Sequence, residues 1–66
     1  MFDNDFLGWA AHQQGIEDFI NILAASDDPN DEANQRRAEY RSGVSLNRLT
    51  DDEIRYIERE VARKWR

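Results

Sequence analysis

The absence of cysteine constrains the fold of this 66-residue chain more than any other feature of its sequence. Small domains usually supplement a thin core with disulfides or a metal, and this chain has no disulfide framework, no thiolate chemistry and no cysteine-based zinc site. We therefore expect a single domain, residues 1–66, that folds by packing alone or by pairing with a partner. A chain this short buries only about 60% of the surface that its unfolded form exposes, which argues against a deep catalytic pocket.

The last third of the chain carries the clearest structural signal, a helix over residues 51–65. Thr50 and Glu53 have the spacing of a capping box, in which each side chain accepts a backbone N–H of the other residue. Acidic residues follow the cap and basic residues end the segment, as the helix dipole favours. Apolar residues recur in steps of three and four, which is one helical stripe: Ile54, Ile57, Val61 and Trp65.

The first third predicts a helix over about residues 4–25, capped by Asp3 or Asn4. Gly15 interrupts its apolar pattern, so we expect one kinked helix, with two shorter helices divided at Gly15 as the alternative. The residues that follow a helical period are Phe6, Trp9, Ala10, Ile16, Phe19, Ile20 and Leu23.

The middle of the chain predicts a helix over residues 29–42. Asp28 would cap it, with Pro29 at its first position, and Gly43 would end it. This segment has few apolar residues, so Tyr40 and the aliphatic stems of its arginines would hold it in place. Three apolar residues in the connector that follows are expected to anchor it to the core: Val44, Leu46 and Leu49.

Together these segments predict an all-α fold, a small three-helix domain. The first and third helices would supply most of the core, with the second helix lying across them. Three ion pairs at helical spacing are expected on its surface: Glu32–Arg36, Asp51–Arg55 and Glu60–Lys64.

The residues that carry chemistry in other proteins are scarce in this chain. His12 is the only histidine and has no second histidine or cysteine with which to bind zinc. The acidic stretch 27–32 lacks the glycine and the distal glutamate of an EF-hand loop, so it is interpreted as a helix-capping turn. We therefore predict no catalytic residue, no metal and no cofactor. The sequence shows neither a secretory signal nor an apolar run long enough to span a membrane, which predicts a cytoplasmic protein without membrane partners.

Charge is divided unevenly along the chain. Residues 1–33 carry eight acids and no lysine or arginine, whereas residues 34–66 carry nine basic residues and six acids, so that the two halves have charges of −8 and +3 within the net −5. Arginine, the main basic residue, suits the binding of carboxylates and phosphates. The candidate surface for a partner or for nucleic acid consists of Arg36, Arg37, Arg41, Arg48, Arg55, Arg59 and Arg63.

The predicted function is a non-enzymatic protein–protein interaction module that binds an unidentified protein, itself, or both through aromatic and arginine side chains. Short, acidic, cysteine-free helical chains are typical of accessory genes of phages and other mobile elements. The alternative is a small nucleic-acid-binding or regulatory protein that uses the arginine-rich half. Acidic residues at the start of the last helix, where a helix-turn-helix protein approaches DNA, count against that alternative. A third and weaker interpretation is an acidic decoy of DNA.

Overall fold

The computed structural model describes the backbone of residues 4–65 and the side chains of residues 11–65. It contains three α-helices, α1 (Asn4–Ala24), α2 (Glu32–Ser42) and α3 (Asp51–Lys64), and a short 3₁₀ turn, η1 (Leu46–Arg48). The prediction of a small all-α domain with three helices is confirmed, and η1 is an element that the sequence did not predict. The capping role of Asp3 or Asn4 and the apolar roles of Phe6, Trp9 and Ala10 lie outside the described residues or side chains.

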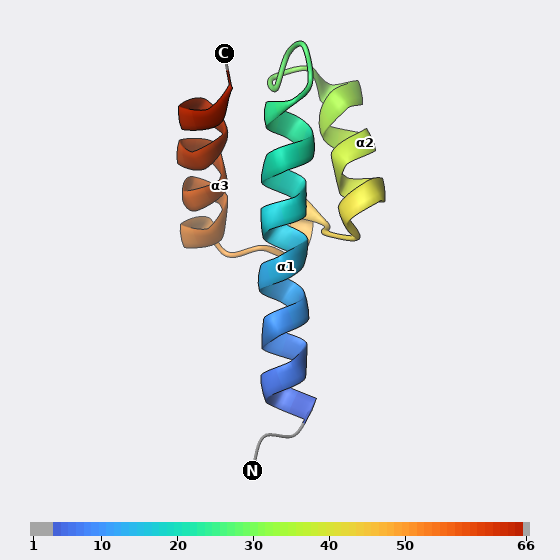
Figure 1. Cartoon of the computed structure of the whole chain (residues 1–66), viewed down its shortest axis with the longest axis vertical. Helices are drawn as coiled ribbons and strands as arrows, with labels where there is room; N and C mark the ends of the chain where they lie inside the picture. Colours follow the sequence, from blue (N-terminus) through green and yellow to red (C-terminus); the bar gives the residue numbers. More distant parts are fainter. Residues whose placement is uncertain (1–3, 66) are drawn as a thin grey trace.

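Helix α1 is the axis of the molecule. Figure 1 shows α2 and α3 on either side of its C-terminal half, while its N-terminal half extends past both of them. Helix α3 runs in the same direction as α1, and α2 runs in the opposite direction. The result is an elongated molecule, with a long dimension of 42 Å against 21 and 18 Å.

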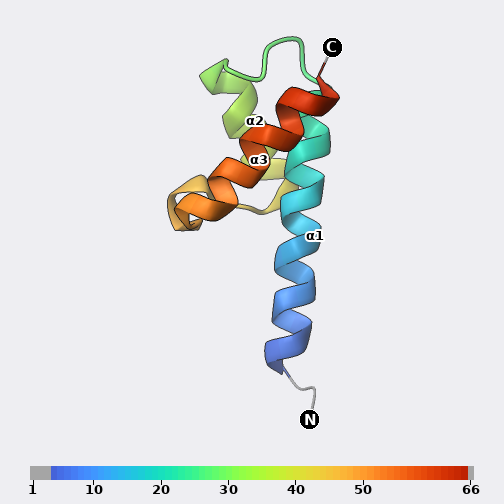
Figure 2. The same cartoon turned by 90° about the vertical axis from the view of Figure 1, so that its left-hand side faces the viewer.

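Gly15 does not divide the first helix. Helix α1 continues from Asn4 to Ala24 and is a single unbroken helix in Figures 1 and 2, so the two-helix alternative is wrong. The glycine instead permits a close approach between helix and connector. A Cβ atom at this position would lie 2.9 Å from Val44 Cγ2 and 3.5 Å from the Ser42 carbonyl oxygen.

Helix α2 begins three residues later than its sequence predicts. The carboxylate of Asp28 accepts the N–H of Asn30 at 2.9 Å, and the Asp28 carbonyl accepts the N–H of Asp31 at 3.1 Å. These bonds turn the chain and keep Pro29 out of the helix. Asp31 is the N-cap instead, with extended backbone and a carboxylate that accepts the Asn34 N–H at 3.3 Å. The prediction that Asp28 caps a helix starting at Pro29 is therefore wrong.

The end of α2 and the start of α3 form as predicted. Gly43 has a φ of 77°, in the left-handed region, and its N–H donates to the Glu39 carbonyl. At the start of α3, Thr50 Oγ1 accepts the Glu53 N–H at 3.2 Å, and Glu53 Oε1 accepts the Thr50 N–H at 2.9 Å. Both halves of the capping box are thus present. These ends could be predicted because each depends on residues at most four positions apart.

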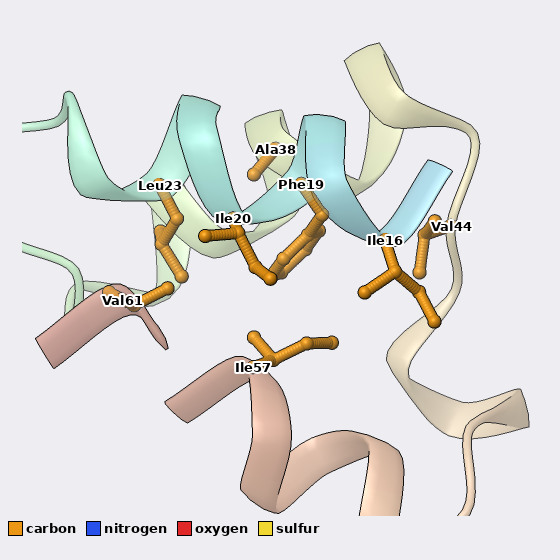
Figure 3. Close-up of a cluster of buried hydrophobic side chains, with 8 residues drawn as sticks. All are labelled: Ile16, Phe19, Ile20, Leu23, Ala38, Val44, Ile57 and Val61. Atoms are coloured by element: carbon orange, nitrogen blue, oxygen red, sulfur yellow. The ribbon is translucent and has the colours of Figure 1, made fainter. Parts of the chain in front are cut away.

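The core lies where α2 and α3 flank α1 (Figure 3). Its residues come mainly from α1 and α3, as predicted, with one each from α2 and from the connector: Ile16, Phe19, Ile20, Leu23, Ala38, Val44, Ile57 and Val61. Leu46 and Leu49 pack against this cluster and are partly buried. The three connector residues that were expected to anchor the chain do so.

Helix α2 lies beside α1 and makes little contact with α3, rather than lying across both. Ala38 is its one buried residue, and this small side chain brings α2 close to α1 while offering nothing to a third helix. Tyr40 is 89% exposed, so the expectation that it holds α2 in place is wrong. Two residues beyond Ala38 on a helix, Tyr40 faces away from α1.

Candidate functional site

A row of hydrogen bonds fastens α3 to α1. His12 Nε2 lies 2.7 Å from Glu53 Oε2, and the Tyr56 hydroxyl donates to Glu17 Oε2 at 2.6 Å. Further along, Lys64 Nζ donates to Asn21 Oδ1 at 3.1 Å. None of these bonds was predicted, because the partners are about 40 residues apart in the chain. They fix the direction of α3 against α1 from its first turn to its last.

Two of these contacts change the acidity of their members. The Thr50 N–H, and after it the His12 side chain, hold the pKa of Glu53 below its usual 4.5. The hydrogen bond to Glu17 raises the pKa of Tyr56, because ionisation would place two negative oxygens side by side. His12 therefore contacts the capping box of another helix, a role that its sequence position did not indicate.

An apolar groove opens between α2 and α3. In Figure 2, α3 lies at an incline to α1, with α2 behind it. The groove has a volume of about 320 Å³. Its residues come from all three helices, the α1–α2 loop and η1: Phe19, Leu23, Pro29, Asn30, Gln35, Leu46, Ile54, Ile57, Glu58, Val61, Ala62 and Trp65.

Trp65 lines this groove beside the loop that follows α1. Its indole Nε1 donates to the carbonyl of Ser26 at 3.1 Å, which fastens the end of α3 to the loop after α1. The side chain is nevertheless 40% exposed, although it lines the groove. An indole whose polar atom is already bonded presents its apolar faces at little entropic cost, as the aromatic residues at binding hot spots do.

The seven arginines of the predicted surface do not form one patch. Arg36, Arg37 and Arg41 lie on α2, Arg48 on η1, and the other three on α3, which is on the opposite side of α1 (Figure 1). All seven are exposed. None of them lines the apolar groove.

Four of these arginines have partners on their own helix. Arg36 pairs with Glu32 at 3.5 Å, as predicted. Arg55 pairs with Asp52 at 3.3 Å rather than with Asp51, and Arg63 rather than Lys64 pairs with Glu60. The two observed pairs that differ from the prediction have a spacing of three residues instead of four. Lys64 donates a hydrogen bond to Asn21 on α1 instead. Arg37 donates to Asn34 Oδ1 at 3.3 Å.

Arg41, Arg48 and Arg59 have no carboxylate within 4 Å among the side chains of residues 11–65. Over the same residues, no group of three or more histidine, cysteine, aspartate or glutamate side chains is arranged to hold a metal. No described helix combines the length and the apolar character that crossing a bilayer requires.

The groove residues could be found only in part from the sequence. The sequence places Trp65 in the apolar stripe of the last helix and predicts that Leu46 anchors the connector. Pro29 and Ile54 were assigned to local structure, as a helix start and a stripe position. What brings them together is the crossing of α3 over α1, for which no short-range pattern exists.

Comparison of the chain with protein-family models, with curated proteins and with solved structures found no match.

Proposed function

We propose that this protein is a non-enzymatic interaction module that binds part of another protein in the groove between α2 and α3. The observation that carries the proposal is the groove itself, an apolar surface on a domain that has little apolar surface to spare. Its floor consists of core residues such as Phe19 and Ile57, so it is shaped by the rigid part of the molecule.

The lining of the groove supports binding rather than chemistry. Among its residues Glu58 is the single ionisable group, so the groove has no second group with which to share a proton. Leu46 and Ile54 are partly buried, and Trp65 is half-exposed. Their remaining apolar surface would be removed from water by a partner, at roughly 25 cal/mol for each Å² buried.

A single substitution tests the proposal without disturbing the core. Ala62 is exposed, lies on α3 and lines the groove, so Ala62→Gln fills part of it with a side chain that helices accept. Ala33→Gln is the matched control, because Ala33 is also exposed and helical but lies on α2 outside the groove. Melting curves of both variants establish that they fold.

The three proteins are used as baits in extracts of the cell that encodes the chain, and captured proteins are identified by mass spectrometry after cross-linking. We expect the wild type and Ala33→Gln to retain the same partner and Ala62→Gln to lose it. A partner that all three folded proteins retain equally would place the interaction elsewhere and overturn the proposal.

Nucleic-acid binding through the arginines stays a second candidate, supported by the lack of described carboxylate partners at Arg41, Arg48 and Arg59. It predicts retardation of duplex or single-stranded probes at low salt, with an affinity that falls steeply as salt rises. The triple substitution of these residues by alanine should then reduce the salt dependence. Unretarded probes at low salt would contradict this function.

A further inference from the structure

We infer that the occupant of the groove is a basic amphipathic helix of a partner protein, with lysine or arginine beside its apolar face where it meets α3 and the α1–α2 loop. This inference rests on the proposed function and specifies the chemistry of the partner. It follows from two properties of the groove, the nature of its walls and the sign of the charge along its rim.

The walls favour a helix over an extended peptide. One wall is α3, whose backbone N–H and C=O groups are already bonded within the helix. The opposite wall consists of Gln35 of α2, Pro29 and Asn30 of the loop and Leu46 of η1. At the loop end, the Pro29 carbonyl accepts a hydrogen bond from Gln35 Nε2 at 3.0 Å. An extended peptide in this groove would leave its own backbone groups without partners, whereas a helix satisfies them internally. A helix of the partner lying between α2 and α3 would also contact both walls at once.

The rim on the α3 side is acidic. Glu58 lines the groove, and Asp51 lies seven residues earlier, which places it on the same face of the helix about 10 Å away. Neither carboxylate has a lysine or arginine within 4 Å among the described side chains. Arg55 lies between them in the sequence, but its guanidinium donates a hydrogen bond to Asp52 Oδ1 at 3.3 Å.

The loop end of the groove is acidic as well. Pro29 and Asn30 line it, and they are flanked by Asp28 and Asp31. The two carboxylates accept backbone N–H groups, from Asn30 and Asn34, and no described cation lies within 4 Å of either. A partner segment would therefore meet negative charge beside the apolar floor and at its end. Complementary positive charge speeds encounter and selects the partner.

A second copy of this chain fits the groove poorly. In a two-fold symmetric pair the same surface faces itself, so the acidic rim that contains Asp51 and Glu58 would face the acidic rim of the other copy. The first ten residues of the chain, which contain apolar side chains, carry Asp3 and Asp5 and no basic residue. Either arrangement would bring like charges together, which costs free energy in a desolvated interface.

The test uses three synthetic helical peptides of about 18 residues, with an identical leucine and phenylalanine face at helical spacing. Their flanking positions are lysine in the first peptide, glutamine in the second and glutamate in the third. Affinities for the full chain are measured by calorimetry at about 50 mM and about 500 mM salt. We expect the lysine peptide to bind at least about tenfold more tightly than the glutamate peptide at low salt, and the ratio to shrink at high salt.

Charge reversal in the rim should invert this order. Asp51→Lys/Glu58→Lys should prefer the glutamate peptide, and Glu58→Lys alone should reduce the preference for lysine if the double variant does not fold. Asp18→Lys is the control, because Asp18 is an exposed acid on α1 that does not line the groove. It makes the same change in net charge as Glu58→Lys alone, and the original order should persist.

The outcomes separate the two proposals. Equal affinities for the three peptides, all abolished by Ala62→Gln, would overturn the basic partner and leave the groove as a binding site. Failure of every peptide to bind, or binding that Ala62→Gln leaves unchanged, would overturn the inference, while the capture experiment with Ala62→Gln and Ala33→Gln still decides the proposed function. A dimer of the wild type that Ala62→Gln dissociates, seen by sedimentation, would assign the groove to a second copy and overturn the inference.

Discussion

At the scale of single residues, Gly15 shows how a position that weakens a helix can be required by the fold. Alanine would improve the helix by up to about 1 kcal/mol. Its Cβ, however, would lie 2.9 Å from a methyl group of Val44, whose branched side chain has little freedom to move. The contact between helix and connector therefore decides the residue at this position.

We predict that Gly15→Ala destabilises the protein by about 1 kcal/mol, because overpacking exceeds the gain in helix propensity. In a Val44→Ala background, which removes the opposing methyl group, the same substitution should stabilise by several tenths of a kcal/mol. Urea unfolding of the four proteins measures both effects. An increase in stability on Gly15→Ala in the presence of Val44 would contradict the close contact.

Glu53 links two structures, since it completes the capping box of α3 and contacts His12 on α1. Its pKa is lowered in the folded state, chiefly by the Thr50 N–H. The carboxylate therefore contributes stability above its usual pKa of 4.5, and this contribution is lost as the pH falls through the folded-state pKa.

We predict that Glu53→Gln is less stable than the wild type at pH 7, and that the difference shrinks as the pH falls from about 5 to about 3. The measurement is the urea midpoint of both proteins across this range. Glu58→Gln, at an exposed position without a described hydrogen-bond donor, serves as the control. A difference that is constant with pH would show that the carboxylate charge of Glu53 contributes nothing.

At the scale of elements, the three helices differ in how much of each could be predicted. Helix α3 was correct from Asp51 to its last turn because its cap and its apolar stripe are short-range patterns. The predicted start of α2 was wrong because Asp28 and Asp31 both have the sequence features of an N-cap residue. The choice between them depends on the turn that Asp28 closes with Asn30.

The end of α2 depends on the left-handed conformation of Gly43. A Cβ there would meet nothing within 4 Å, so any cost of substitution is conformational. We predict that Gly43→Ala lowers the free energy of unfolding by about 1 kcal/mol and that Gly43→Asn lowers it less, because asparagine tolerates this region. Thermal and urea unfolding of both variants would show this order, and equal losses would contradict it.

At the scale of the whole molecule, α2 and α3 are attached to α1 in different ways. Helix α3 contributes two core residues and three side-chain hydrogen bonds to α1, while α2 contributes Ala38 alone to the core. The groove stays open because α2 has no large apolar side chain that would pack against α3. The groove could not be predicted from sequence for the same reason, since it depends on what α2 lacks.

The difference in attachment predicts the order in which the molecule opens. Amide hydrogens of α2 should exchange with solvent at a lower free energy of opening than those of α3 and of the C-terminal half of α1. Native-state hydrogen exchange, followed by NMR at increasing denaturant, measures these free energies for each residue. Identical values in α2 and α3 would mean that the domain opens only as a unit, although α2 supplies a single core residue.

The indole of Trp65 has a practical consequence for anyone who attaches this protein to a surface or to a label. It lines the groove at the end of the described chain, while α1 begins at the far end of the molecule (Figure 1). A tag fused after the last residue would stand at the mouth of the groove and compete with whatever enters it. Immobilisation through the first residues leaves the groove accessible, and the fluorescence emission of Trp65 can report on occupancy of the groove.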